Sequence, residues 1–257
     1  VLRPGRTPAW HGSLPLALVP LVQAGGTRAG SARFHDETDF MNADHNWIAF
    51  ALSSAVFFAY EVWVVWVGWR HPDRIARSAH ASMRANWVDA MGRQPGFEIV
   101  AVQALRNSLM SATIAASTAA LALMGSVSLA SSTLESASFD GTPPLRVVLE
   151  VLLMATLFAS YVCSAMAMRF FSHAGFVMSM PVASPERSAL NPMAREYVQR
   201  AGLLYSWALR FFLMISPLVV GIVRPVGMPF MAIALVVALW FFDRPAKPGP
   251  VTATDTG

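Results

Sequence analysis

Long apolar runs separated by short polar stretches are the main pattern of the chain. Most of these runs approach or exceed the roughly 20 residues that a helix needs to cross the hydrocarbon core of a bilayer. They predict an all-α fold, a polytopic bundle of four to five transmembrane helices at residues 46–69, 103–130, 145–168, 203–223 and 228–242. The last run would form only about 22 Å of helix, so the pattern leaves open whether it crosses fully.

The composition supports lipid as the solvent of these runs. Hydrophobic residues make up 55% of the chain and charged residues 13%, the latter about half the share found in soluble domains. This apolar excess excludes a disordered chain, and a soluble globule would lack the charge to cover its surface. The net charge of +4 comes without a basic stripe or a stacking-aromatic motif, so we expect no nucleic-acid partner. The single cysteine, Cys163, excludes an intramolecular disulfide.

Arginines gather in alternate loops, which predicts how the helices are oriented. Residues 70–97 contain five arginines and residues 169–202 contain four, whereas residues 131–144 contain none. Because basic residues concentrate in cytoplasmic loops, we expect the N-terminus outside and the C-terminus in the cytoplasm.

The two ends of the chain lie outside this pattern. We assign residues 41–245 to the transmembrane domain and residues 246–257 to a flexible tail. Residues 1–40 fit either a signal peptide or translation upstream of a true start at Met41. We favour the second interpretation, because the arginines of this segment would otherwise lie outside, against the charge rule that the loops obey. On that interpretation, residues 1–40 are a non-native or disordered extension.

The first basic loop has a helical pattern of its own. Apolar residues recur there at every fourth position, and the arginines fall elsewhere on the helix: Ile75, Ala79, Met83, Trp87 and Met91. This predicts an interfacial amphipathic helix, with its apolar stripe against lipid and its arginines near anionic head groups. The alternative is a connector helix packed on the bundle.

Small residues recur at every fourth position of the second span, at Ser108, Ala112, Ala116 and Ala120. Such a ridge lets helix backbones approach closely in lipid. We therefore expect this helix to lie at the centre of the bundle.

Several short strings carry a resemblance to a known family. They are Tyr60-Glu61, Arg84-Ala85-Asn86-Trp87, Ala101–Met110, Arg169–His173, Leu209–Phe212 and Ser216–Leu218. The third string is the most specific, because three polar side chains enter a membrane helix there. From about Asn46 to Asp243 the chain resembles the membrane proteins grouped as "domain of unknown function 599". This resemblance implies a multi-pass protein of the bacterial inner membrane and carries no activity with it; residues 1–40 have no counterpart in it.

Charged side chains inside the spans need a partner or a role, because each costs at least ~2.5–3.5 kcal/mol at the centre of a membrane helix. Glu61, Arg106 and Arg210 each lie roughly 10–12 Å inside the cytoplasmic end of their span. We therefore predict a buried cluster in which Glu61 accepts from Arg106, with Arg210 as the second candidate donor. Gln103 and Asn107 would complete the hydrogen bonding.

Two other interpretations of this cluster stay open. If the second span begins at Leu109, the Arg106 side chain extends to the lipid head groups instead. A buried ion pair can also serve only to fix the packing of the helices, without any functional role.

The remaining polar groups give weaker candidates. Glu150 is expected to pair with Arg146 one turn earlier. Arg169 and His173 are secondary candidates near the cytoplasmic end, where an interfacial histidine is favoured over a proton relay. The histidines lack metal-ligand spacing, and no nucleophile or phosphate-loop motif is present, so we predict no catalytic residue, metal or cofactor.

Three functions remain open at this point. The first is transport of a small solute or proton through the polar layer, with Pro217 and Gly221 supplying an irregular stretch of helix nearby. The second is an accessory protein that binds another membrane complex through the small-residue ridge. The third is an enzyme acting on lipid head groups, which we rank last because no motif supports it. The expected partners are the lipid bilayer and, for a transporter this small, a homo-oligomer or another membrane protein.

Overall fold

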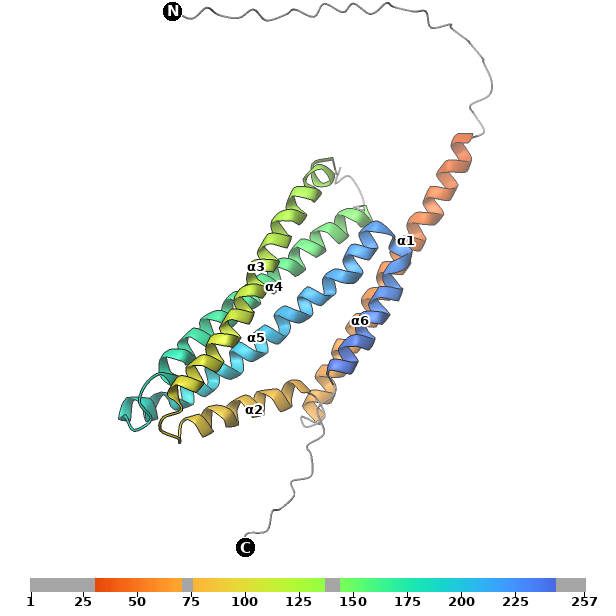
Figure 1. Ribbon diagram of the computed structural model, residues 1–257. Coiled ribbons are helices and arrows are strands. Elements are labelled where there is room, and N and C mark those ends of the chain that lie inside the picture. The colour runs from red at the N-terminus through yellow and green to blue at the C-terminus, as the bar shows by residue number, and fades with distance from the viewer. Residues whose placement is uncertain (1–30, 71–75, 137–143, 244–257) are drawn as a thin grey trace, which may run out of the picture. The chain divides into compact units, whose positions relative to one another are not determined.

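Every regular element in the computed structural model is a helix, within the residues that it describes, which are 31–70, 76–136 and 144–243 (Figure 1). The elements are α1 (Ser31–Arg70), α2 (Ala76–Met91), α3 (Glu98–Ser136), α4 (Leu145–Met178), α5 (Pro185–Val223), the 3₁₀ turn η2 (Pro225–Gly227) and α6 (Met228–Phe242). Five helices, α1, α3, α4, α5 and α6 together with η2, are long and apolar enough to cross a membrane. The predicted all-α fold with up to five spans is therefore confirmed.

The chain divides into two units, residues 1–41 and residues 42–257, and the five candidate membrane spans lie in the second unit. Helix α1 begins at Ser31, ten residues before Met41. The predicted tail at residues 246–257 lies outside the described part of the chain.

Besides α1, three helices continue well beyond their predicted spans. Helix α3 begins at Glu98, α4 continues to Met178, and α5 begins at Pro185 instead of near residue 203. Hydropathy marks only the apolar part of a helix, so the predicted spans do not include the polar turns at these helix ends. The start of α5 follows local rules: the Ser184 side chain accepts a hydrogen bond from the backbone N–H of Arg187 at 3.2 Å, and Pro185 occupies the first turn. These extensions all lie at one end of the bundle, which we call the α2 end.

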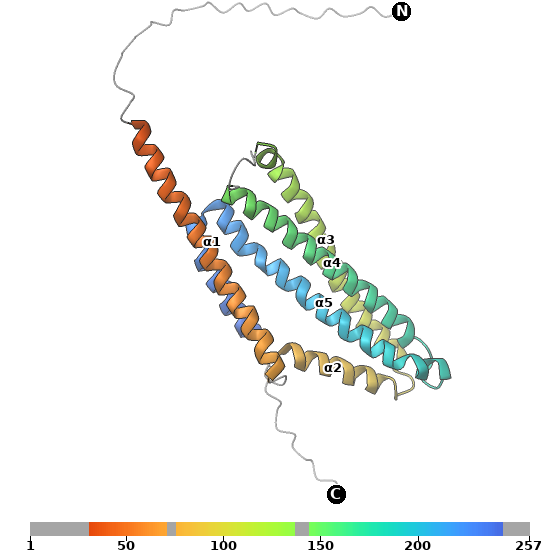
Figure 2. The ribbon, with the colours of Figure 1, turned by 180° about the vertical axis from the view of Figure 1, so that it is seen from behind.

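Helix α2 packs lengthwise along the first part of α5, in the opposite direction (Figures 1 and 2). Near its end, the Asp89 carboxylate lies 3.7 Å from Nε of Arg195. Nearer its start, Nε2 of Gln199 donates to the carbonyl of Ala81 at 3.5 Å. The earlier residue of α2 thus contacts the later residue of α5, as expected for antiparallel helices.

The apolar side chains of α2 face the bundle at two positions that the stripe did not include. Ala85 and Val88 are each only 1% exposed, whereas Met83 of the stripe is 61% exposed. The side chains of Ile75 and Ala79 lie outside the described part. The predicted helix is thus present, and its contacts are those of the connector helix packed on the bundle.

Helices α3, α4 and α5 are joined by small side chains. Buried small residues recur along the facing sides of these helices: Ala112, Ala116 and Ala119 on α3, Ser160, Ser164, Ala167 and Ala174 on α4, and Ala194, Ala201 and Ala208 on α5. Small side chains let the backbones approach closely enough for the Ser160 hydroxyl of α4 to donate to the carbonyl of Ala208 at 2.9 Å.

The small-residue ridge of α3 is used inside the chain. Ala112 is fully buried in a cluster with Ala167 and Phe171 of α4. The central helix is nevertheless α5, which contacts α2, α3, α4 and α6, whereas α3 packs chiefly on α4. The expectation that the second span lies at the centre is therefore corrected.

A buried arginine holds the turn between α4 and α5. Arg187 is completely buried, and its Nη1 donates to the carbonyls of Val177 at 2.8 Å and Met180 at 3.0 Å. The Glu98 carboxylate at the start of α3 accepts from the backbone N–H of Val182 in the same turn, at 3.2 Å. The end of α4 thus has side-chain partners for carbonyl groups that a helix end leaves free.

Helix α5 is continuous through Pro217. Proline has no N–H to donate to the carbonyl of Leu213, and the hydroxyl of Ser216 donates to that carbonyl instead, at 2.9 Å. The irregular stretch expected around Pro217 is therefore absent from α5.

The α3–α4 contact makes a testable prediction. Ala112→Leu should lower the midpoint of thermal unfolding in detergent, because a larger side chain at a fully buried position costs about 1–3 kcal/mol. Ser117→Leu on the exposed side of the same helix is the matched control and should change the midpoint little. Equal effects of the two substitutions would contradict the packing described here.

Candidate functional site

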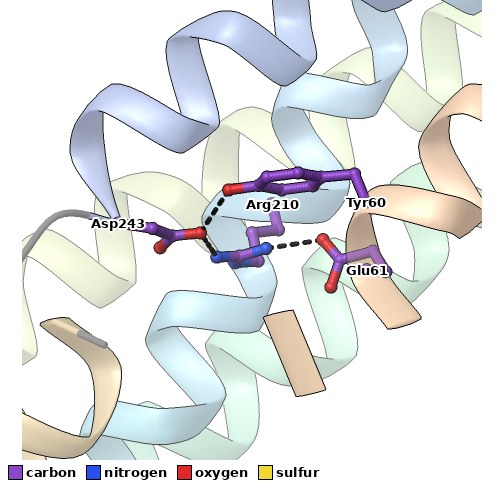
Figure 3. A network of polar contacts seen from close by, with 4 residues as sticks. All are labelled: Tyr60, Glu61, Arg210 and Asp243. Carbon is purple, nitrogen blue, oxygen red and sulfur yellow. Dashed lines mark hydrogen bonds and ion pairs between the residues drawn. The ribbon is translucent and has the colours of Figure 1, made fainter. Parts of the chain in front are cut away.

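Four polar side chains from three helices meet inside the bundle (Figure 3). Arg210 of α5 donates from Nη1 to Oε1 of Glu61 on α1 at 2.5 Å, and from Nη2 to Oδ2 of Asp243 just after α6. The hydroxyl of Tyr60 on α1 donates to the same Asp243 oxygen at 2.7 Å. One guanidinium therefore bridges two carboxylates that belong to two other helices. We call these four residues the Arg210 network.

The Arg210 network is largely shielded. The side chain of Arg210 is 6% exposed, that of Glu61 13% and that of Asp243 20%. The second carboxylate oxygen of Glu61, Oε2, is buried and has no hydrogen-bond partner within the described part of the chain. Such an orphaned oxygen is costly where water is excluded.

The three charged groups lie at a common depth. The helical segments that lead to them from the end opposite α2 are residues 44–61, 210–224 and 228–243. At 1.5 Å per residue, each group lies about 21–26 Å from that end. In a hydrocarbon core of ~30 Å this is the part nearer the α2 end.

The short length of α6 positions Asp243. Helix α6 follows the turn at Pro225–Gly227 and has 15 residues, so it ends at the level of Arg210. Helix α6 also packs on α1, where Tyr60 and Val64 contact Leu235 and Leu239. The long side chain of Arg210 then reaches both carboxylates from α5.

The charges of the Arg210 network do not balance. When ionised, Glu61 and Asp243 contribute two negative charges against the single positive charge of Arg210. A net charge in a low-dielectric layer is unfavourable, and one bound proton or monovalent cation removes it. The site is therefore suited to bind and release one positive charge.

A small cavity lies near the network, although none of the four network residues lines it. It has a volume of about 110 Å³ and is lined by residues of α1, α4, α5 and α6. Phe57 and Met214, which line it, lie one helical turn from Glu61 and Arg210, on the side away from the α2 end. Ser53 and Ser54 are the hydroxyl-bearing residues of a lining that is otherwise apolar.

The structure brings together two of the five residues predicted to form the cluster. Glu61 pairs with Arg210, the second candidate donor, and the expected pairing with Arg106 is corrected. Three residues lie instead on the exposed side of α3: Gln103, Arg106 and Asn107. The buried side of α3 carries Leu105 and Ala112, and each residue step rotates the side chain by about 100°. Arg106 therefore lies at the predicted depth, but its side of α3 faces away from Glu61 and Arg210.

Sequence reasoning missed Tyr60 and Asp243. The depth argument contained the signal for Asp243, because a 15-residue helix that starts at the opposite end must stop at the level of Glu61 and Arg210. The sequence singled out Tyr60 only as part of the Tyr60-Glu61 string that carries the family resemblance. Its role depends on the rotation of α1 against α6, which depth alone does not reveal.

The secondary candidates lie in other surroundings. Nε of Arg146 donates to Oε1 of the buried Glu150 at 2.9 Å, the pair expected one turn apart. Arg169 is exposed, and the ring of His173 lies against that of Tyr197 with a centroid separation of 5.7 Å. Among the described residues no group of three or more His, Cys, Asp or Glu side chains could hold a metal ion.

Comparison with known proteins gives one match. The profile of a family described as "Protein of unknown function, DUF599" matches residues 48–248, which is more than half of the chain and includes all four residues of the Arg210 network. No curated protein and no solved structure matches the chain.

The network makes a prediction for stability. Arg210→Gln should destabilise the protein by about 3–5 kcal/mol, because it leaves two buried carboxylates without their cation. Glu61→Gln should cost less, and the double variant should lose less than the sum of the two single losses. Thermal unfolding in detergent measures each difference.

The matched control for Arg210→Gln is Arg106→Gln, which removes an exposed arginine and should change stability by no more than about 0.5 kcal/mol. Strict additivity of the Glu61 and Arg210 substitutions would show that the two side chains are not coupled.

Proposed function

The chain belongs to the DUF599 family, whose description assigns no activity, and we propose that it transports a proton, alone or with a small solute, across the membrane through the Arg210 network. The observation that carries this proposal is the excess, among the described residues, of one carboxylate over the single arginine of this shielded layer at membrane depth.

Glu61 is the residue that we assign to proton binding. Its Oε1 accepts from Arg210, while its Oε2 is buried without a partner among the described residues and is placed to take up a proton. Protonation there removes the net negative charge while the bond from Arg210 to Oε1 can persist. Asp243 is less suited to this role, because its Oδ2 already accepts from both Tyr60 and Arg210.

The neighbouring cavity supports a route for the proton. It lies about one helical turn from the network, on the side of the end opposite α2, and its volume of about 110 Å³ is enough for a few water molecules. Ser53 and Ser54 offer hydroxyl groups along this side of α1. Helix α6 ends just before Asp243. The layer that contains the network is therefore nearer to the α2 end than to the opposite end.

The arginine-rich loops suggest which end of the bundle faces the cytoplasm. They lie at the α2 end, which we assign to the cytoplasmic side of a bacterial inner membrane, with the N-terminus outside and the C-terminus inside. The site would then lie nearer to the cytoplasm. The alternative of an accessory protein that binds through the small-residue ridge receives no support, because Ala112 and Ala116 are buried within the chain.

Proton flux into vesicles tests the proposal. The purified protein is placed in liposomes that contain a pH-sensitive dye, and a potassium diffusion potential drives protons inward. We expect flux with the unaltered chain and about a tenfold or larger loss with Glu61→Gln, because an amide keeps an oxygen for Arg210 but cannot carry the proton.

The matched control is Glu150→Gln, which alters another buried carboxylate that is paired with an arginine and has one orphaned oxygen, Oε2. This variant should keep the flux of the unaltered chain. The proposal is wrong if folded Glu61→Gln protein conducts protons as well as the unaltered chain does. It is also wrong if the unaltered chain shows no proton flux, with or without added solutes.

A further inference from the structure

A second cavity lies at the α2 end, apart from the Arg210 network. Its volume is about 460 Å³, within the range of small-molecule sites. Helices α2, α3, α4 and α5 all contribute to its lining, which includes Arg84, Trp87, Ser108, Phe171, Gly202 and Tyr205.

Arg84 contributes a positive charge to this cavity without a counter-charge. Its Nε is buried without a hydrogen-bond partner, and Arg84 forms no ion pair in the described part of the chain. Burial lowers the pKa of Arg84 from its usual value, but a guanidinium stays charged at neutral pH. An unpaired, partly buried cation of this kind favours an anionic ligand.

The position of the guanidinium depends on Gly202 of α5. A Cβ atom at position 202 would lie only 2.2 Å from Cζ of Arg84, and 2.4 Å from its Nε. The Arg84 head group therefore rests directly on the α5 backbone, in a space that any other residue at position 202 would fill.

Among the other polar groups of the lining, the hydroxyls of Ser108 and Ser111 donate to backbone carbonyls of α3, whereas Trp87 and Tyr205 have donors left. The indole N–H of Trp87 and the hydroxyl of Tyr205 make no hydrogen bond among the described residues, and no carboxylate lines the cavity. The rest of the lining is largely apolar, with Met83, Leu105 and Val198 among its members. A ligand that fits such a lining combines an anionic group with an alkyl part.

The depth of the cavity identifies the kind of ligand. Gly202 lies 22 residues before Arg224 along α5, which is about 33 Å from the end opposite α2. The hydrocarbon core is ~30 Å thick, so Arg84 lies at the level of the lipid head groups. Phosphate groups of membrane lipids are concentrated at this level.

We propose that the Arg84 cavity binds the phosphate group of an anionic lipid, with the acyl chain against the apolar part of the lining. Arg84 supplies the counter-charge, and Trp87 and Tyr205 are placed to donate hydrogen bonds to the phosphate oxygens. The site is independent of the proton site proposed above, because none of its lining residues belongs to the Arg210 network.

Lipid binding to the full-length, delipidated protein in detergent tests this proposal. The fraction of protein that retains one phosphatidylglycerol is measured by native mass spectrometry as the lipid is titrated, with phosphatidylcholine as the zwitterionic comparison. We expect phosphatidylglycerol to bind more tightly than phosphatidylcholine. Arg84→Gln should weaken phosphatidylglycerol binding about tenfold or more, since it removes the charged donor.

Two further variants separate the site from general charge effects. Gly202→Ala keeps every charge but displaces the Arg84 head group, so it should also weaken phosphatidylglycerol binding. Arg106→Gln removes an exposed arginine from α3 and should leave binding unchanged. If Arg84→Gln does not yield folded protein, the site is tested by comparing the phosphatidylglycerol affinity of Gly202→Ala with that of Arg106→Gln.

Inorganic phosphate and glycerol phosphate distinguish the two sources of a phosphate group. Neither should displace the lipid at millimolar concentration if the acyl chain contributes to binding. Displacement of the lipid by either compound would overturn the assignment to a lipid and indicate a soluble phosphate compound. Equal affinity of Gly202→Ala and the unaltered chain for phosphatidylglycerol would overturn the site itself.

Discussion

The pairing of one guanidinium with two carboxylates is the interaction on which the arrangement of α1, α5 and α6 depends. In lipid, apolar side chains gain little by leaving one helix surface for another, whereas an unpaired charge is strongly unfavourable. Arg210 is the cation that both Glu61 and Asp243 contact at this depth, so each carboxylate is paired only if it lies within reach of the guanidinium. The need to pair these charges therefore restricts the rotation of α1 and the length of α6 together.

The other helices are held by a different kind of contact. Along α3, α4 and α5 the buried side chains are mostly small, and close backbone approach with many dispersion contacts takes the place of charge pairing. The hydrogen bond from Ser160 to the carbonyl of Ala208 depends on this approach. The bundle thus combines three closely packed helices with a helix pair, α1 and α6, that is joined to α5 through a polar layer.

The two candidate sites have opposite charge. Within the described part of the chain, the Arg210 network has one negative charge in excess, and the Arg84 cavity has one positive charge without an ion-pair partner. Both lie against α5, where Gly202 and Arg210 are eight residues, or about 12 Å, apart. The difference in depth underlies the two proposals: a shielded layer favours binding of a proton, which removes charge, whereas at the head-group level anions are present that remain charged.

The sequence by itself determined the five helices, the positions of their apolar parts and the depth of Glu61 and Arg210, because hydropathy and the rise per residue act along a single helix. Only the tertiary structure decided that Asp243 and Tyr60 join these residues and that Arg106 does not. That choice depends on how each helix is rotated about its axis, and rotation is set by contacts between helices, such as Ala112 of α3 against α4. The full lengths of α3, α4 and α5 also became visible only there, because their polar turns are stabilised by partners distant in sequence, such as Glu98 for Val182.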